Sequence, residues 1–268
     1  MKKPSVLVTG RSSFLALSFI KAAAGTVDVT QVARIDTDGI GSKTFDAVVN
    51  FACDPAYFTD DYDSSLDVDA VLSEQLKGRF GHYFMLSSRL VYGRTESLAI
   101  SEDRTKNPQG PYGRNKAVTE DLLLDRLGSG LTVLRLANVF GAERKRRTFA
   151  GVALESLKTK GEIVLDIAPS TRRDFLPARD FAQALTRLVA IRPGGVFNLG
   201  SGHPTPVGDI ANWFVQGYGV GRVRVTAEQP SDEFCLDITA VKKLVGDITT
   251  PGAIERQAIE AGRSLQHA

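Results

Sequence analysis

Residues 5–16 read SVLVTGRSSFLA, an apolar run followed by a turn and the start of a helical apolar pattern. The run 5–9 predicts a strand, Gly10 a tight turn, and 14–24 a helix that Gly25 ends. A strand that passes through a glycine turn into a helix is typical of a dinucleotide-binding βαβ unit, in which the helix N-terminus faces a pyrophosphate. This opening predicts a doubly wound α/β fold.

The rest of the chain continues the alternation of strands and helices, as in a parallel sheet that is covered on both faces. Further strands are predicted at 29–35, 46–51, 81–86, 131–136 and 196–199. Further helices are predicted at 65–77, 112–127 and 179–190, with Ser64 as the cap of the first of these. We expect a Rossmann-fold domain from 1–140 with 178–200, and a small C-terminal substrate-binding lobe from 141–177 with 201–268.

Composition limits the function classes. With 268 residues, 43% of them apolar, the chain can bury a large core. A net charge of +2 gives no bias toward nucleic acid or membrane, and 144–147 is a local basic run of a kind that is usually solvated. Two cysteines and no apolar stretch of membrane length predict a cytoplasmic protein without disulfides. The three histidines do not form a metal set, so no metal site is predicted.

Tyr112 and Lys116 stand four residues apart at the start of the predicted helix 112–127, and therefore share one face. A lysine ammonium beside a phenol favours the phenolate, which lets a tyrosine exchange protons below its usual pKa of about 10. Ser87 and Ser88 follow an upstream strand. This combination predicts a carbonyl/alcohol oxidoreductase.

The opening turn and six further pieces of the sequence, in order, resemble the extended short-chain dehydrogenase/reductases, and specifically the NAD-dependent epimerase/dehydratase family that acts on nucleotide-linked sugars. Besides the opening turn and the Tyr112–Lys116 pair, they are DAVVNFA at 46–52, SSRLVYG at 87–93, LRLANVFG at 134–141, RDF at 173–175 with Asp180, and FNLGSG at 197–202. The resemblance covers nearly the whole chain.

The family implies roles for these residues. Tyr112 would be the general acid or base, Lys116 would hydrogen-bond the nicotinamide ribose and lower the pKa of the tyrosine, and Ser88 would orient the substrate oxygen. The substrate would be bound by Ser88, Asn138, Arg146 and Arg173, with help from Arg147. The alternative for the arginines is salt bridging with Asp174 or Asp180.

The cofactor would be NAD or NADP, and the sequence leaves the choice open. The residues expected to bind it are Gly10, Arg11, Ser13, Phe14, Leu15, Arg34, Asp36, Phe51, Ala52 and Lys116. Asp36 favours NAD through the ribose hydroxyls, whereas Arg34 favours NADP through the 2′-phosphate. Ser13 and Ala16 replace two glycines of the family turn, and only 37–44 separates Asp36 from the next strand.

Other departures narrow the reaction. Arg89-Leu90 stands where dehydratases of the family carry Asp-Glu, which disfavours elimination of water. Before Asp232, where the family often has a second arginine, the chain has Gln229-Pro230-Ser231. We therefore expect a 4-epimerase or a 4-ketoreductase of a nucleotide-linked sugar, acting at C4, as a homodimer by family analogy. The alternative is a non-catalytic NAD(P)-binding sensor or structural protein of the same fold.

Overall fold

The computed structural model describes residues 2–267 except 34–37, 95–96, 144–146 and 230. At its centre lies a parallel sheet of six strands in the order β10-β6-β4-β3-β1-β2. The strands are β1 (Ser5–Thr9), β2 (Asp28–Gln31), β3 (Ala47–Asn50), β4 (Tyr83–Ser88), β6 (Leu131–Leu136) and β10 (Gly195–Leu199). From β1 the chain first adds β2 on one side and then β3, β4, β6 and β10 on the other. This reversal of strand order confirms the predicted doubly wound sheet.

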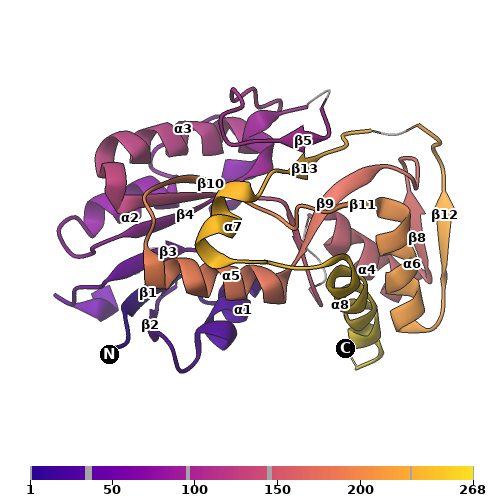
Figure 1. The fold of residues 1–268 in the computed structure, drawn as a ribbon, viewed down its shortest axis with the longest axis horizontal. Helices are drawn as coiled ribbons and strands as arrows, with labels where there is room; N and C mark the ends of the chain where they lie inside the picture. The colour runs from indigo at the N-terminus through magenta and orange to yellow at the C-terminus, as the bar shows by residue number, and fades with distance from the viewer. Residues whose placement is uncertain (1, 34–37, 95–96, 144–146, 230, 268) are drawn as a thin grey trace.

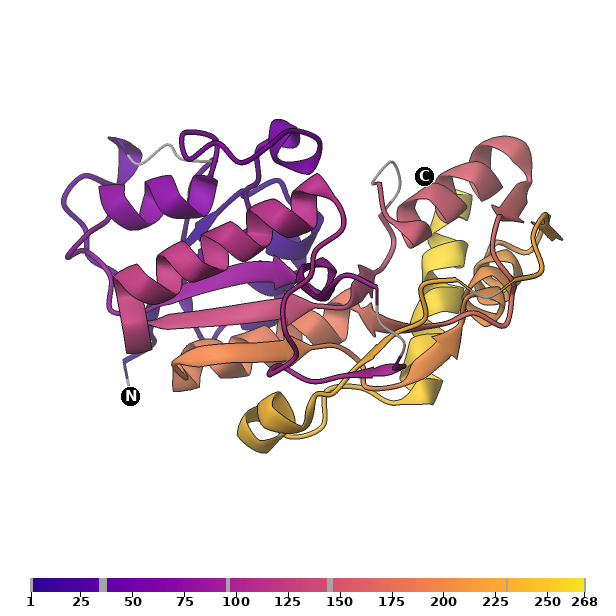
Figure 2. The ribbon, with the colours of Figure 1, turned by 90° about the horizontal axis from the view of Figure 1, so that it is seen from above.

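Helices cover both faces of this sheet (Figures 1 and 2). On one face lie α2 (Val68–Gln75) and α3 (Pro111–Leu127), whose side chains Leu72 and Leu123 are fully buried against the strands. On the other lie α1 (Phe14–Ala23) and α5 (Ala178–Ile191), which bury Phe19 and Leu185. The strands are therefore apolar on both sides, as a buried parallel sheet requires.

Two predicted boundaries are wrong. The helix expected at 65–77 begins at Val68, because the Asp67 carboxylate, and not Ser64, caps it by accepting a hydrogen bond from the Ala70 amide. The strand expected at 81–86 is shifted to 83–88, which brings Ser87 and Ser88 into the strand end. The strand expected at 29–35 is β2, which ends at Gln31, so Val32 and Ala33 lie outside it, and the predicted ribose-reading residues Arg34 and Asp36 lie outside the described residues.

A second hydrophobic core lies beside the sheet domain, at the right of Figure 1. It is built from β7 (Asn138–Phe140), α4 (Phe149–Lys160), β8 (Glu162–Leu165), β9 (Arg172–Pro177), α6 (Val207–Tyr218), β12 (Arg222–Val225) and α8 (Pro251–Arg263), and β11 (Pro204–Pro206) pairs with β9. The chain thus leaves the sheet after β6 and returns to it through α5 and β10. The exact division into two domains stays a prediction.

Short elements complete the chain. They are β5 (Ala99–Ile100), β13 (Cys235–Leu236), α7 (Thr239–Val245), and 3-10 turns η1 (Asp38–Ile40), η2 (Pro55–Phe58), η3 (Arg89–Tyr92), η4 (Gly128–Gly130) and η5 (Ser264–His267). Among the residues that the structure describes, no helix has the length and apolar character needed to span a bilayer.

Candidate active site

The turn after β1 packs tightly against the end of β3. Gly10 has φ +67°, and a Cβ there would lie 2.7 Å from the Ala52 amide nitrogen, so only glycine fits without movement of the backbone. The Ser13 amide donates to the Gly10 carbonyl at 2.7 Å, and the Ser13 hydroxyl makes no capping hydrogen bond to α1. This hydroxyl stands at the start of α1 and lines the cavity described next.

A cavity of about 420 Å³ lies where the carboxyl ends of the parallel strands converge, between the sheet and the second core. Of the predicted site residues, it is lined by Ser13, Leu15, Phe51, Ala52, Ser88, Tyr112, Lys116, Asn138, Arg147 and Arg173. Gly10 and Arg11, in the adjoining turn, and Phe14, the first residue of α1, do not line it. Arg146 lies outside the described residues. Sequence reasoning missed Phe58, Arg89 and Phe149, which also line it.

Helix α3 brings Tyr112 to this cavity. Pro111 occupies the first helical turn, where its missing amide hydrogen costs no hydrogen bond. The Tyr112 ring stacks on Phe58 with a centroid distance of 4.6 Å and an interplanar angle of 7°, and meets Tyr57 edge to face at 6.2 Å. Both partners come from η2, so this turn fixes the orientation of the phenol.

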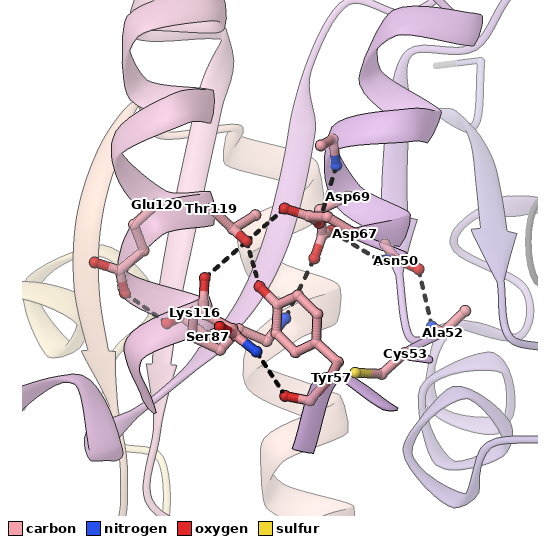
Figure 3. Close-up of polar contacts among 12 residues, drawn as sticks. Asn50, Ala52, Cys53, Tyr57, Asp67, Asp69, Ser87, Lys116, Thr119 and Glu120 are labelled. Atoms are coloured by element: carbon pink, nitrogen blue, oxygen red, sulfur yellow. Dashed lines mark hydrogen bonds and ion pairs between the residues drawn. The ribbon is translucent and has the colours of Figure 1, made fainter. Parts of the chain in front are cut away.

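Lys116 lies one turn further along α3 and is only 5% exposed. Its Nζ is 3.2 Å from Oδ2 of Asp69 on α2 and stands 5.5 Å from the centre of the Tyr57 ring (Figure 3). Burial alone would lower the pKa of Lys116, but the Asp69 carboxylate outweighs it and holds the pKa well above the usual value. Asp69 is the partner that sequence reasoning missed.

The Asp69 carboxylate receives hydrogen bonds from three donors. Asn50 Nδ2 and the Tyr83 hydroxyl donate to Oδ1 at 2.7 and 3.0 Å, and Lys116 donates to Oδ2. Burial raises the pKa of Asp69, against the effect of Lys116. A protonated carboxyl would need an acceptor, and all three contacts are donors, so the geometry suits the ionised form. Asn50 Oδ1 also accepts from the Ala52 amide at 2.8 Å, which ties this group to the turn at Gly10.

The two adjacent serines face different surroundings. Ser87 is buried and donates to Glu120 of α3, which also pairs with Arg135 of β6 at 2.7 Å. The Ser88 hydroxyl accepts from the Leu90 amide at 3.2 Å and is only partly buried at the cavity. Ser88 is therefore the serine whose hydroxyl remains near space for a ligand.

Two arginines share one carboxylate at the other end of the cavity. Arg89 Nη1 lies 2.9 Å from Asp232 Oδ1, and its guanidinium stands over the Phe234 ring at 4.0 Å. Arg173 Nη2 lies 3.8 Å from Oδ2 of the same aspartate. Burial raises the pKa of Asp232, but Arg89 and Arg173 outweigh it and lower the pKa. The partner of Arg173 is thus Asp232 and not Asp174 or Asp180.

The described residues that line the cavity include arginine and lysine but no aspartate or glutamate. One cation of the two-arginine group is uncompensated by Asp232, so the cavity suits an anionic ligand. The turn and helix start at Ser13, and the phenol and lysine further along, fit the pyrophosphate and nicotinamide ends of a dinucleotide. Arg34 and Asp36, the residues predicted to read its adenosine ribose, lie outside the described residues.

Comparison with known proteins gives one family. The NAD dependent epimerase/dehydratase family matches residues 6–200. A putative UDP-glucose 4-epimerase of Methanocaldococcus jannaschii is 33% identical over 135 residues, which cover 47% of this chain and 43% of that protein. The UDP-glucose 4-epimerase of Azospirillum brasilense is 31% identical over 147 residues, covering 46% and 42%. These matches span less than half of either relative.

Solved structures resemble the whole chain. A UDP-N-acetylglucosamine 4-epimerase from Methanobrevibacter ruminantium, in complex with UDP-N-acetylmuramic acid, superposes with a TM-score of 0.84 at 19% identity, over 100% of this chain and 99% of that one. A dTDP-glucose 4,6-dehydratase from Bacillus anthracis in complex with NAD gives 0.79 at 15% identity, over 98% and 97%. At these identities the likeness shows the shared fold.

Proposed function

This chain belongs to the NAD-dependent epimerase/dehydratase family, and we propose that it oxidises or reduces C4 of a nucleotide-linked sugar, as a 4-epimerase or a 4-ketoreductase. The observation that carries the proposal is the meeting of Ser88, Tyr112 and Lys116 at one cavity beside the glycine turn. A nicotinamide cofactor, when bound, supplies or accepts the hydride.

In the oxidising direction, C4 loses a hydride and its hydroxyl loses a proton to the Tyr112 oxygen, which leaves a ketone; reduction reverses both transfers. Ser88 orients the oxygen on C4. Phe58 holds the phenol in place through ring stacking. Lys116 keeps a positive charge next to the phenol and binds the ribose of the cofactor.

The arginines favour a diphosphate substrate. Arg89, Arg147 and Arg173 line the cavity, and planar guanidinium groups match phosphate oxygens. Arg89 supplies a second cation beside Arg173, although the segment before Asp232 lacks the second arginine that the family often has there. Arg89 also argues against dehydration, because it occupies a position at which elimination of water would need a carboxylate.

One experiment tests the cofactor part of the proposal. Freshly purified protein is denatured, any released dinucleotide is identified by mass, and the emptied protein is titrated with NADH and NADPH. Stoichiometric bound NAD supports an epimerase that retains its cofactor, and an empty protein that binds NADPH supports a ketoreductase. A protein that binds neither contradicts the proposal and favours the non-catalytic alternative.

A second experiment tests the role of Tyr112. We expect Tyr112→Phe to lose turnover on sugar nucleotides by about 100-fold or more, because the proton at the sugar oxygen has no acceptor. Cofactor affinity should stay close to that of the parent, since the ring and its stacking remain. Turnover equal to that of the parent would remove Tyr112 from the reaction. The expected homodimer stays a prediction that analytical ultracentrifugation can test.

A further inference from the structure

The side chain that contacts the Lys116 ammonium is Asp69, which comes from another helix and is not one of the predicted catalytic residues. Asp69 projects from the first turn of α2 toward α3 (Figure 3). The residue is only 3% exposed, and its Oδ2 lies 3.2 Å from the Lys116 ammonium nitrogen. A buried ammonium without a partner tends to lose its proton. The Lys116 charge therefore depends on this contact.

We propose that Asp69 is a positioning residue for the reaction, which holds the Lys116 ammonium charged and in place beside the Tyr112 phenol. This inference rests on the proposed function, because it gives Lys116 a task at the cofactor and the phenol. Asp69 itself does not line the cavity, so it acts through Lys116.

The carboxylate is in turn fixed from two sides. Asn50, at the end of β3, and Tyr83, at the start of β4, both donate to Oδ1, which leaves Oδ2 directed at Lys116. Asn50 also accepts from the Ala52 amide and from the Thr9 hydroxyl, so the lysine is connected to the strand ends that form the cofactor turn. Two strands of the sheet thus set the position of one ammonium.

The other ionisable groups near Lys116 cannot replace Asp69. From η2 and the loop before it come Tyr57 and Cys53, both neutral in their ordinary states at neutral pH, and from its own helix comes Tyr112, the group that exchanges the proton in the proposed reaction. Burial raises the pKa of Tyr57 further. Asp67, which caps α2, is the nearest carboxylate to Asp69 along the chain, and its oxygens accept from Ala70, Tyr62 and Thr119.

Asp67 provides a matched control. Asp67→Asn removes a buried carboxylate two residues away that makes no contact with Lys116, and asparagine can still cap α2. Asp69→Asn removes the charge that contacts Lys116 and keeps the size of the side chain. Both variants are made in a Tyr112→Phe background, so that a phenolate cannot take the place of the lost carboxylate.

The measurement is the titration of the Lys116 side chain by nuclear magnetic resonance of lysine-labelled protein, with the signal identified by its loss in Lys116→Arg. We expect Lys116 to keep its proton beyond the pH of about 10.4 at which exposed lysines titrate. In Asp69→Asn its midpoint should fall at least about one pH unit below the exposed lysines, toward the range of buried unpaired lysines. In Asp67→Asn it should stay near the parent value.

Two results would overturn the inference: a parent midpoint at or below that of exposed lysines, or equal midpoints in the two variants. The first needs no variant, so it decides even if Asp69→Asn does not fold. With Tyr112 present, we also expect turnover of Asp69→Asn to decline as pH rises through the lowered lysine midpoint, and turnover of Asp67→Asn not to do so. Identical pH profiles would reduce Asp69 to a structural role. Absence of turnover in the parent contradicts the proposed function, while the titration still decides the hold on Lys116.

Discussion

Helix α3 carries two buried ion pairs that look alike and lie one turn apart. Lys116 pairs with Asp69 at 3.2 Å, and Glu120 pairs with Arg135 at 2.7 Å, and each of the four residues is at most 5% exposed. We call them the pocket pair and the sealed pair. Only the pocket pair has a member that contacts the cavity, namely Lys116.

The surroundings of the two pairs differ more than their geometry. The sealed pair is closed by protein groups: Arg135 also donates to the Tyr92 hydroxyl and the Glu102 carbonyl, and Glu120 also accepts from Ser87. The ammonium of the pocket pair has one carboxylate, an aromatic face and then the cavity. Burial and pairing therefore do not identify a functional residue by themselves, because both pairs have them; contact with space for a ligand does.

The largest expected effect on stability separates the pairs directly. Glu120→Gln leaves the Arg135 guanidinium buried without a carboxylate, and we expect a loss of about 3–5 kcal/mol in the free energy of unfolding. Urea unfolding at neutral pH measures it. Below the unfolding temperature, turnover should remain within about 10-fold of the parent, since no group of the sealed pair meets substrate.

The neighbouring residue gives the control for this variant. Asp121→Asn removes a carboxylate whose side chain is 69% exposed and which pairs with Lys106 at 2.5 Å. Exposed pairs of this kind contribute less than about 1 kcal/mol. If Glu120→Gln were no more costly than Asp121→Asn, the sealed pair would not be a stabilising element and the contrast with the pocket pair would fail.

Removing the charge of the pocket pair should lower turnover. Lys116→Met keeps an unbranched side chain in the same space but removes the charge beside Tyr112, and we expect turnover to fall about 100-fold to 10,000-fold. Steady-state kinetics on the sugar nucleotide that the parent converts would measure this. A drop in stability with unchanged turnover would make the pocket pair a second sealed pair.

How far the sequence predicts these pairs depends on the kind of contact. The doubly wound sheet and the convergence of Ser88, Tyr112 and Lys116 follow from local patterns, because strand, turn and helix signals lie within a few residues of one another. Asp69 and Lys116 are 47 residues apart, and so are joined only by the packing of α2 on α3. Asp67 and Asp69 fall inside the helix predicted at 65–77 with Ser64 as its cap, and local pattern gave neither aspartate a role.

The same reason explains the arginines. The sequence showed Arg89 in place of a carboxylate, and it showed that an arginine is missing before Asp232. It did not show that Arg89 pairs with Asp232, because the two residues lie 143 positions apart. The cavity contacts of Phe58, from η2, were also missed. Long-range partners of charged residues were the part that local pattern could not supply.

A neutral polar contact at the opposite end of β4 and β6 extends the comparison. His82 is 4% exposed, and its Nε2 lies 2.7 Å from the Thr132 hydroxyl. Burial, with Arg192 nearby, lowers the pKa of His82 to about 4. Between that value and about 6.5 the unfolded chain binds the extra proton, so stability is lost as pH falls through this window.

We expect the parent to lose about 1–2 kcal/mol of unfolding free energy from this group between pH 6.5 and pH 4, and His82→Gln to lack that part of the slope. Carboxylates elsewhere in the chain also titrate at acidic pH, so the quantity to compare is the difference in slope between the parent and His82→Gln. Parallel slopes would mean that His82 is protonated in the folded protein. The contact between His82 and Thr132 would then contain a charged group, like the two ion pairs.

The smallest effect concerns the ring beneath Lys116. The Tyr57 hydroxyl contacts Thr119, while its ring stands under the ammonium and beside Tyr112. Tyr57→Phe removes the hydroxyl and keeps the ring, so we expect a loss of about 1 kcal/mol in unfolding free energy, the contribution of one ordinary hydrogen bond. The Lys116 midpoint should not move, because Asp69 and the aromatic face both remain. A midpoint shift as large as that of Asp69→Asn would show that the hydroxyl network, and not the carboxylate contact, holds the ammonium, and the pocket pair would lose the feature that distinguishes it from the sealed one.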